Sequence, residues 1–185
     1  ELQSTIARLQ NEPDLQCHYP ARVAWLSQQL PGFADALPEA ECPKYQQWRS
    51  KVGDYGVTLV LASSFLNSPS SMYGHTFLRF DDNAEGQGET LGAYAVNFGA
   101  EVGQDSEGLM YAIKGLFGGY NGFFSDGPYY EKVKEYSRFD NRDVWEYRLN
   151  LRGQEMDRLL MHLWELQNIN FDYFFFDENC SYRLL

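Results

Sequence analysis

Cys180 has the sequence context of a nucleophilic thiol. It follows an aromatic run at residues 173–176 and three polar residues at 177–179, where a helix is expected to begin. A thiol in the first turn of a helix lies near the positive end of the backbone dipoles, which favours the reactive thiolate. The carboxylates of Asp177 and Glu178 act in the opposite direction, because nearby negative charge favours the neutral thiol. We therefore expect activation of Cys180 to depend on a base more than on the dipole.

His75 is the best candidate for that base. It opens a strand-like segment, residues 75–80, directly after a turn rich in small residues. The other two histidines have weaker contexts, since His162 falls off the apolar stripe of a predicted helix and His18 adjoins a proline-rich turn. Taken alone, Cys180 also suits an unreactive core position and His75 suits a residue that caps the turn. Their combination favours a functional Cys–His pair.

Asn97 is the candidate that would orient the imidazole. If residues 81–90 form a hairpin loop, Phe80 pairs with Leu91 and His75 lies opposite Val96, next to Asn97. An amide oxygen that accepts from one ring N–H would hold the other ring nitrogen toward the sulfur. A shift of one residue in this register decides whether the two side chains share a face of the sheet.

A Cys–His enzyme also needs donors for the oxyanion that forms on the attacked carbonyl. The backbone N–H of Cys180 is expected to serve, because the first N–H groups of a helix have no partner within it. Asn179 and Tyr73 are candidates for an additional side-chain donor to the oxyanion or substrate.

Cys17 and Cys42 lie in a stretch broken by prolines, far from Cys180. A disulfide between them would close a loop of about 25 residues and contribute about 3 kcal/mol in the chain-entropy model. Reduced cysteines in a cytosolic protein are the alternative, but the polar, turn-like surroundings favour the disulfide. No CxxC or HxxxH pair suggests a zinc site, and no motif predicts a cofactor.

Composition restricts the function classes. The chain has 185 residues, 44% of them hydrophobic, and a formal net charge of −11. Lysine and arginine form no run, which argues against nucleic acid as a partner and against membrane binding by charge alone. No stretch reaches the roughly 20 apolar residues of a spanning helix. The first residue is Glu1 without an apolar leader, so we expect a processed or excised segment, with any anchor outside it.

The hydrophobic pattern predicts an α+β chain. Helical spacing interrupted by prolines covers residues 1–50, and the predicted strands and the last long helix cover 57–62, 75–80, 91–98, 144–149 and 154–168. Residues 103–130 interleave glycines with aromatic residues. This segment suits either an apolar lid or acyl-chain groove, or an ordered loop whose aromatic rings fill the core.

Several of these motifs together resemble a known family. The segments 71–79, 95–98 and 178–181 are similar to the bacterial periplasmic domain typified by the Lnb lipoprotein N-acyltransferases, and residues 17–22 and 42–48 resemble the small helical region that precedes it. That family is related to circularly permuted papain-like enzymes of the NlpC type, in which the histidine strand comes before the cysteine helix.

The resemblance implies a fold and a domain division. We expect a permuted papain-like domain with an antiparallel sheet at residues 51–185, preceded by a disulfide-stapled helical region at 1–50. The chain stops about one turn into the helix that Cys180 opens, so we expect the natural protein to continue, with segments that could bring it to a membrane.

The resemblance also implies a function. It predicts a periplasmic thiol enzyme that forms an acyl-enzyme at Cys180 and acts as an acyltransferase or hydrolase on lipid or lipoprotein acyl groups. One alternative keeps this chemistry in a cysteine peptidase or amidase on peptidoglycan peptides, although the acidic surface argues against a polyanionic substrate. Another is a non-catalytic scaffold or binding domain of the cell envelope.

Overall fold

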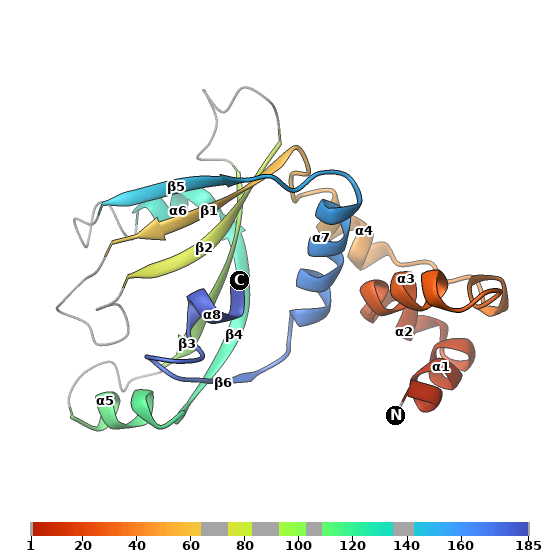
Figure 1. Cartoon of the computed structure of the whole chain (residues 1–185), viewed down its shortest axis with the longest axis horizontal. Coiled ribbons are helices and arrows are strands. Elements are labelled where there is room, and N and C mark those ends of the chain that lie inside the picture. Colours follow the sequence, from red (N-terminus) through yellow and green to blue (C-terminus); the bar gives the residue numbers. More distant parts are fainter. Residues whose placement is uncertain (1, 64–73, 83–92, 103–108, 135–142, 185) are drawn as a thin grey trace. The chain divides into compact units, whose positions relative to one another are not determined.

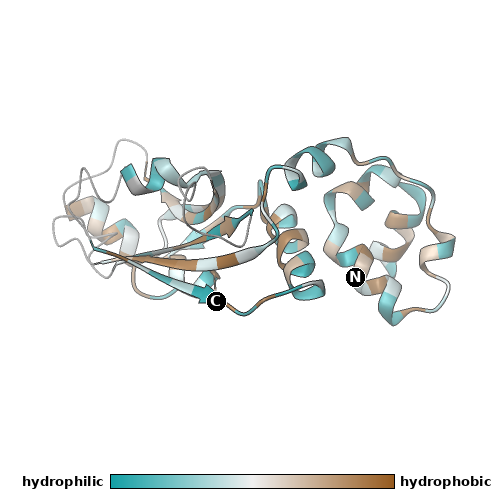
Figure 2. Ribbon diagram, turned by 90° about the horizontal axis from the view of Figure 1, so that it is seen from above, coloured by the Kyte–Doolittle hydropathy of each residue, from teal (hydrophilic) through white to brown (hydrophobic). Residues whose placement is uncertain are grey.

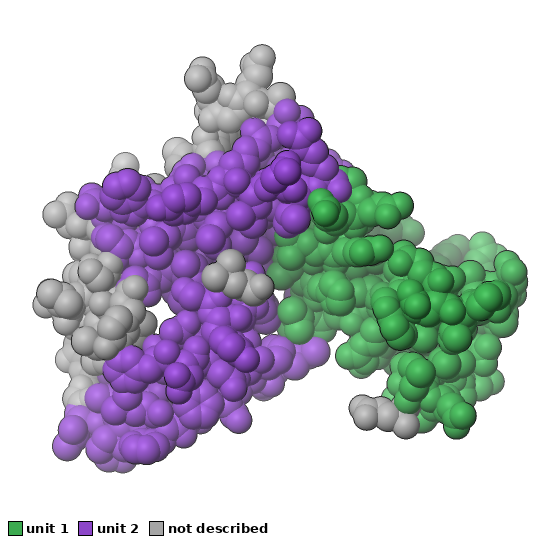
Figure 3. Space-filling view, viewed as in Figure 1, with its two compact units in different colours: residues 1–51, 153–166 green, residues 52–152, 167–185 purple. Residues whose placement is uncertain are grey.

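The computed structural model describes residues 2–63, 74–82, 93–102, 109–134 and 143–184. Contacts divide the chain into two compact units, residues 1–51 with 153–166, and residues 52–152 with 167–185 (Figure 3). The predicted division at residue 51 puts residues 153–166 in the second domain, whereas the contacts group them with the N-terminal helices. Among the described residues, no helix has both the length and the apolar character needed to cross a membrane.

The first unit is helical. It contains α1 (Leu2–Asn11), α2 (Pro13–His18), α3 (Pro20–Gln29), a 3-10 turn (Ala34–Ala36), α4 (Pro43–Arg49) and α7 (Gln154–Leu166). Proline opens α2, α3 and α4, a position where its missing N–H costs no helical hydrogen bond. Apolar and polar residues alternate along these helices (Figure 2), and Leu9, Leu26 and Phe33 form the buried centre.

The predicted disulfide is confirmed within this unit. Cys17 in α2 bonds to Cys42, the residue before α4, with their Cα atoms 5.2 Å apart. The indole N–H of Trp164 in α7 donates to the backbone oxygen of Cys17 at 2.7 Å. Glu165 is buried and accepts from the backbone N–H of Arg22 at 2.9 Å. These contacts fasten α7 to the disulfide-linked helices.

The second unit is built on one antiparallel sheet of six strands in the order β5-β1-β2-β3-β4-β6. Its strands are β1 (Gly56–Ala62), β2 (His75–Asp81), β3 (Tyr94–Glu101), β4 (Tyr120–Pro128), β5 (Val144–Leu149) and β6 (Phe171–Tyr173). The mixture of helices and antiparallel sheet confirms the predicted α+β class.

Short helices cover the two faces of this sheet (Figure 1). Helix α6 (Tyr129–Val133) packs through Tyr129 onto Phe77 of β2. Phe77 and His75 point to the same face of the sheet, because alternate residues of a strand do so. Helix α8 (Cys180–Leu184) contacts β2 and β3 on the other face, where the Ser181 hydroxyl meets that of Thr76 at 3.1 Å. Helix α5 (Leu109–Leu116) precedes β4.

Two sequence predictions differ from the structure. The third strand starts at Tyr94 rather than Leu91, and Phe80 pairs with Tyr94, so the predicted hairpin register is shifted by three residues. The glycine- and aromatic-rich segment 103–130 contains a regular helix and a nine-residue strand where it is described. Glycines allow this close packing: at Gly118, whose φ is +73°, a Cβ atom would lie 2.4 Å from the ring of Phe174.

Candidate active site

His75 and Asn97 are joined by a buried hydrogen bond. The ring Nε2 of His75, the first residue of β2, contacts the Oδ1 of Asn97 on β3. Asn97 lies opposite Phe77, so it is the diagonal neighbour of His75 on the same face of the sheet. Because an amide oxygen only accepts, this contact places the Nε2 proton on His75 and leaves Nδ1 for another partner. The structure thus brings together the predicted base and its orienting residue.

Cys180 supplies that other partner. It begins α8, as predicted, and only 3% of its surface is exposed. Its sulfur hydrogen-bonds to the His75 side chain and accepts the backbone N–H of Thr76 at 3.5 Å. The hydroxyl contact between Thr76 and Ser181 fixes α8 against β2 beside this bond. The three predicted residues of the Cys–His–Asn arrangement are therefore neighbours.

The environment of Cys180 produces an acidic thiol. Burial raises the pKa of Cys180, because the charged thiolate is poorly solvated there. The hydrogen bond from His75 and the positive charge of its imidazolium form outweigh burial, and the Thr76 N–H adds to their effect, which brings the pKa of Cys180 from 9.0 down to about 6. At neutral pH the thiolate is therefore the main form of Cys180.

The nearby carboxylates do not prevent this ionisation. Asp177 and Glu178 were expected to favour the neutral thiol, but the pKa of Cys180 is lowered rather than raised. Glu178 forms an ion pair with Arg183 of α8, and this pairing compensates its charge. The expectation that activation depends on the base agrees with the structure, since His75 makes the largest favourable contribution.

Asn179 caps the helix that carries the thiol. Its Oδ1 accepts the backbone N–H groups of Ser181 and Tyr182 at 3.1 and 3.3 Å, and its Nδ2 donates to the Phe175 oxygen at 3.1 Å. Its predicted role as an oxyanion donor stays a prediction. Tyr73, the other predicted donor, lies outside the described residues.

Tyr173 is a contact of the thiol that the sequence analysis did not identify. Only 3% of its surface is exposed, and its phenol is close enough to Cys180 for the charge of the thiolate to act on it. Burial raises the pKa of Tyr173, and negative charge on Cys180 raises it further, so the phenol keeps its proton. A sequence signal for this contact exists, because Tyr173 is the one hydroxyl-bearing residue in an otherwise all-phenylalanine run, and buried tyrosine hydroxyls usually find a partner.

A cluster of packed rings supports the segment that leads to Cys180. It comprises Phe98, Tyr111, Tyr120, Phe124, Phe171, Tyr173 and Phe175. The backbone N–H of Phe175 donates to the oxygen of Gly115 in α5 at 2.9 Å. A Cβ atom on Gly115 would lie 2.1 Å from the Phe175 ring, so α5 rests directly on this segment.

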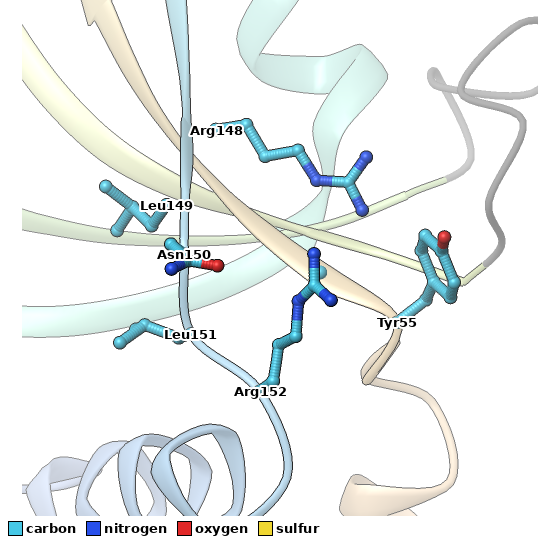
Figure 4. Close-up of a pocket in the computed structure, with 7 residues that line it drawn as sticks. Tyr55, Arg148, Leu149, Asn150, Leu151 and Arg152 are labelled. Atoms are coloured by element: carbon cyan, nitrogen blue, oxygen red, sulfur yellow. The ribbon is translucent and has the colours of Figure 1, made fainter.

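The pocket drawn in Figure 4 is a different place in the second unit. Tyr55, Arg148 and Arg152 line it, and Cys180, His75 and Asn97 do not. Within the described ranges, no three histidine, cysteine, aspartate or glutamate side chains gather where they could hold a metal ion.

Comparison with known proteins gives one match. The sequence model of a family described as "Lnb N-terminal periplasmic domain" matches residues 44–185, the range that contains β1–β6 and all residues of the candidate site. No curated protein matches the chain, and neither does any solved structure.

Proposed function

Because the chain belongs to the family of Lnb N-terminal periplasmic domains, we propose that it is a periplasmic thiol enzyme with Cys180 as nucleophile and His75 as base. Asn97 orients the imidazole. The observation that carries this proposal is the buried cluster in which Asn97 holds the His75 ring by a hydrogen bond and His75 in turn contacts the Cys180 sulfur, which lowers the pKa of the thiol against the effect of burial. A buried cysteine with only a structural role does not need a base beside it.

The proposed reaction forms an acyl-enzyme. His75 takes the thiol proton at Nδ1, and the thiolate attacks the carbonyl carbon of an ester or amide. As the tetrahedral intermediate collapses, the bond to the leaving group breaks and the imidazolium returns its proton to that group. An amine or water then gives a proton to His75 and attacks the thioester. This transfers the acyl group or hydrolyses it and regenerates the thiol.

The order of the site along the chain supports the finer fold proposal. The strand with His75 precedes the helix with Cys180. This is the order expected of a circularly permuted papain-like domain of the NlpC type, and we propose that architecture for residues 51–185.

The surroundings of the site favour an acyl substrate. Helix α5 and the residue that follows it expose large apolar side chains, with Leu109 at 76%, Met110 at 62% and Phe117 at 78% of their surface. Exposed apolar groups of this size are typical of surfaces that bind lipids or apolar ligands. The link from α5 through Phe175 to Cys180 connects this surface with the nucleophile. We therefore propose lipid or lipoprotein acyl groups as the substrate class.

Mass spectrometry of the intact protein tests the proposal. We would incubate the chain with a diacylated lipopeptide, with phospholipid vesicles and, separately, with peptidoglycan peptides. The expected result is an acyl adduct on Cys180 from one of the first two substrates. The adduct should be absent in Cys180→Ser and strongly reduced in His75→Ala. His162→Ala is the matched control, because His162 is exposed on α7.

Two results would contradict the proposal. Cleavage of the peptidoglycan peptides without an acyl-lipid adduct would favour the peptidase alternative. If none of the substrates forms an adduct or is cleaved, while Cys180 remains a free thiol, the non-catalytic alternative is favoured.

A further inference from the structure

The residue that follows the proposed base on β2 contacts the residue that follows the proposed nucleophile on α8. Thr76 comes directly after His75, and Ser181 comes directly after Cys180. The hydroxyl oxygens of Thr76 and Ser181 lie 3.1 Å apart. Thr76 also donates its backbone N–H to the Cys180 sulfur at 3.5 Å. One residue therefore contacts the helix through its side chain and the thiol through its backbone.

The end of the ladder between β2 and β3 leaves this backbone N–H for the sulfur. The two strands pair only as far as Phe77 and Asn97, although both continue beyond this pair. The same register would place Thr76 opposite Phe98 at the next step. Helix α8 contacts both strands, and the Thr76 N–H donates to the sulfur instead. Because a buried N–H needs a partner, the thiol takes the place of a strand carbonyl.

We propose that Thr76 is a positioning residue for the proposed reaction: its hydroxyl contact with Ser181 holds the start of α8 where the Thr76 N–H reaches the Cys180 sulfur. This inference rests on the proposed function, because it concerns the same nucleophile. Thr76 exchanges no proton and forms no covalent bond. It keeps the sulfur at a fixed distance from the strand that carries His75, and the rate of attack depends on that distance.

Both partners of the hydroxyl contact are held in place by other bonds. Only 6% of the Thr76 surface is exposed, and β1 pairs Thr76 with Leu61. The backbone N–H of Ser181 donates to the Oδ1 of Asn179 at 3.1 Å. Groups that are already ordered lose little further freedom when they form a contact. The hydroxyl contact therefore fixes the start of α8 against β2.

The N–H bond to the sulfur favours the thiolate. Burial raises the pKa of Cys180, and the contacts with His75, followed by those with Thr76, lower it to about 6. If the start of α8 moves away from β2, the bond from the Thr76 N–H lengthens and stabilises the thiolate less. The pH at which Cys180 becomes reactive thus reports the position of the helix.

The test measures the midpoint of thiol–disulfide exchange with a small disulfide reagent as a function of pH. Thr76→Val removes the hydroxyl but keeps the backbone N–H, and Ser181→Ala removes the partner of that hydroxyl. We expect each change to raise the midpoint by about 0.4–1 pH unit, the size of one net hydrogen bond, and the double variant to show no further shift. Thr76→Ser keeps a hydroxyl and should retain the wild-type midpoint. Formation of the acyl adduct should slow about 10- to 100-fold in Thr76→Val.

Thr58→Val is the matched control, because it removes another buried threonine hydroxyl, which donates to the Oδ2 of Asp81 at 3.2 Å. It should leave the midpoint unchanged even where it lowers the melting temperature. An unchanged midpoint in Ser181→Ala would overturn the positioning role, whether or not Thr76→Val shifts it. A Thr76 hydroxyl that acts on the thiol without Ser181 does not hold the helix.

The inference and the proposed function fail in different ways. If Thr76→Val does not fold, Ser181→Ala decides the matter, because Ser181 is only half-buried and its loss leaves β2 intact. Unchanged midpoints together with an acyl adduct on the wild type would reject the role of Thr76 and leave the proposed function standing. Absence of an adduct on the wild type would reject the proposed function, and with it the role of Thr76 in that reaction.

Discussion

Replacement of His75 by alanine should change both the acidity and the nucleophilicity of Cys180. The pKa of the thiol is about 6, and the hydrogen bond and charge of His75 are the main causes of its lowering. Without them, burial is opposed only by the Thr76 contacts, so we expect the pKa to rise, and the ordinary value of 9.0 is used for the rates below. At pH 7 the thiolate fraction would then fall from about 90% to about 1%.

The rate of thiol–disulfide exchange should fall by less than the thiolate fraction does. A thiolate of higher pKa is more nucleophilic, with a Brønsted coefficient of about 0.4–0.5, so a change of three units makes the variant thiolate about 15- to 30-fold more reactive. The net decrease at pH 7 is then about 3- to 6-fold, and at pH 5 it grows to about 30- to 60-fold. Above about pH 8 the variant should react faster than the wild type.

The assay is thiol–disulfide exchange with a small disulfide reagent, measured from pH 5 to pH 10.5. Removal of the imidazole also opens space beside the sulfur, so the midpoint of each rate profile, rather than the absolute rate, reports the effect of His75 on the pKa of the thiol. His162→Ala serves as the control and should follow the wild-type profile. Two profiles with the same midpoint would refute the assignment of His75 as the cause of the acidic thiol.

Three further predictions concern the supporting structure. Asn97→Ala should slow acyl-enzyme formation by up to about 100-fold, because the base loses its orientation but remains present. Replacement of both Cys17 and Cys42 by serine should lower the free energy of unfolding of the helical unit by about 3 kcal/mol in urea titrations. Gly115→Ala should destabilise by about 1–3 kcal/mol despite the better helix propensity of alanine, because its Cβ atom would meet the Phe175 ring.

Each of these predictions has a control or a contradicting outcome. Ser125→Ala removes the other partner of Asn97, a weak contact of 3.5 Å, and should leave acylation nearly unchanged. A reducing agent added to the wild type should reproduce the effect of the disulfide variant. At Gly127 a Cβ atom would lie 3.9 Å from its nearest neighbour, the Oε2 of Glu131, so Gly127→Ala should cost little. Equal stability of the Gly115 and Gly127 variants would contradict the packing argument.

The hairpin shows why the orienting residue was found although the predicted register was wrong. The sequence placed Phe80 opposite Leu91, whereas the structure pairs it with Tyr94. A shift of three residues is odd, so it moves Asn97 onto the face of the sheet that His75 uses. The alternation of apolar residues defined the strands, but the start of the third strand depends on how residues 83–92 connect the pair. Local patterns do not determine that connection.

The contacts of the Cys180 thiol show a second limit to what the sequence can predict. Thr76 and Tyr173 are ordinary members of strand-like runs. They come close to Cys180 only when α8 packs against β2 and β6 pairs with β4. The sequence nevertheless identified Cys180 and His75, because a histidine at a strand start and a cysteine at a helix start are local features. The hydrogen bonds between strands and helix are long-range and could not be predicted from either segment alone.

The electrostatics of Cys180 depend on distance in space rather than along the chain. The carboxylates of Asp177 and Glu178 lie three and two residues before it and would disfavour the thiolate. Successive side chains at the start of a helix point in different directions, and Glu178 turns to the guanidinium of Arg183. His75, far away in sequence, instead faces the sulfur. The fold therefore outweighs the effect of the neighbouring carboxylates, and the contact with His75 is what lowers the pKa of this buried cysteine.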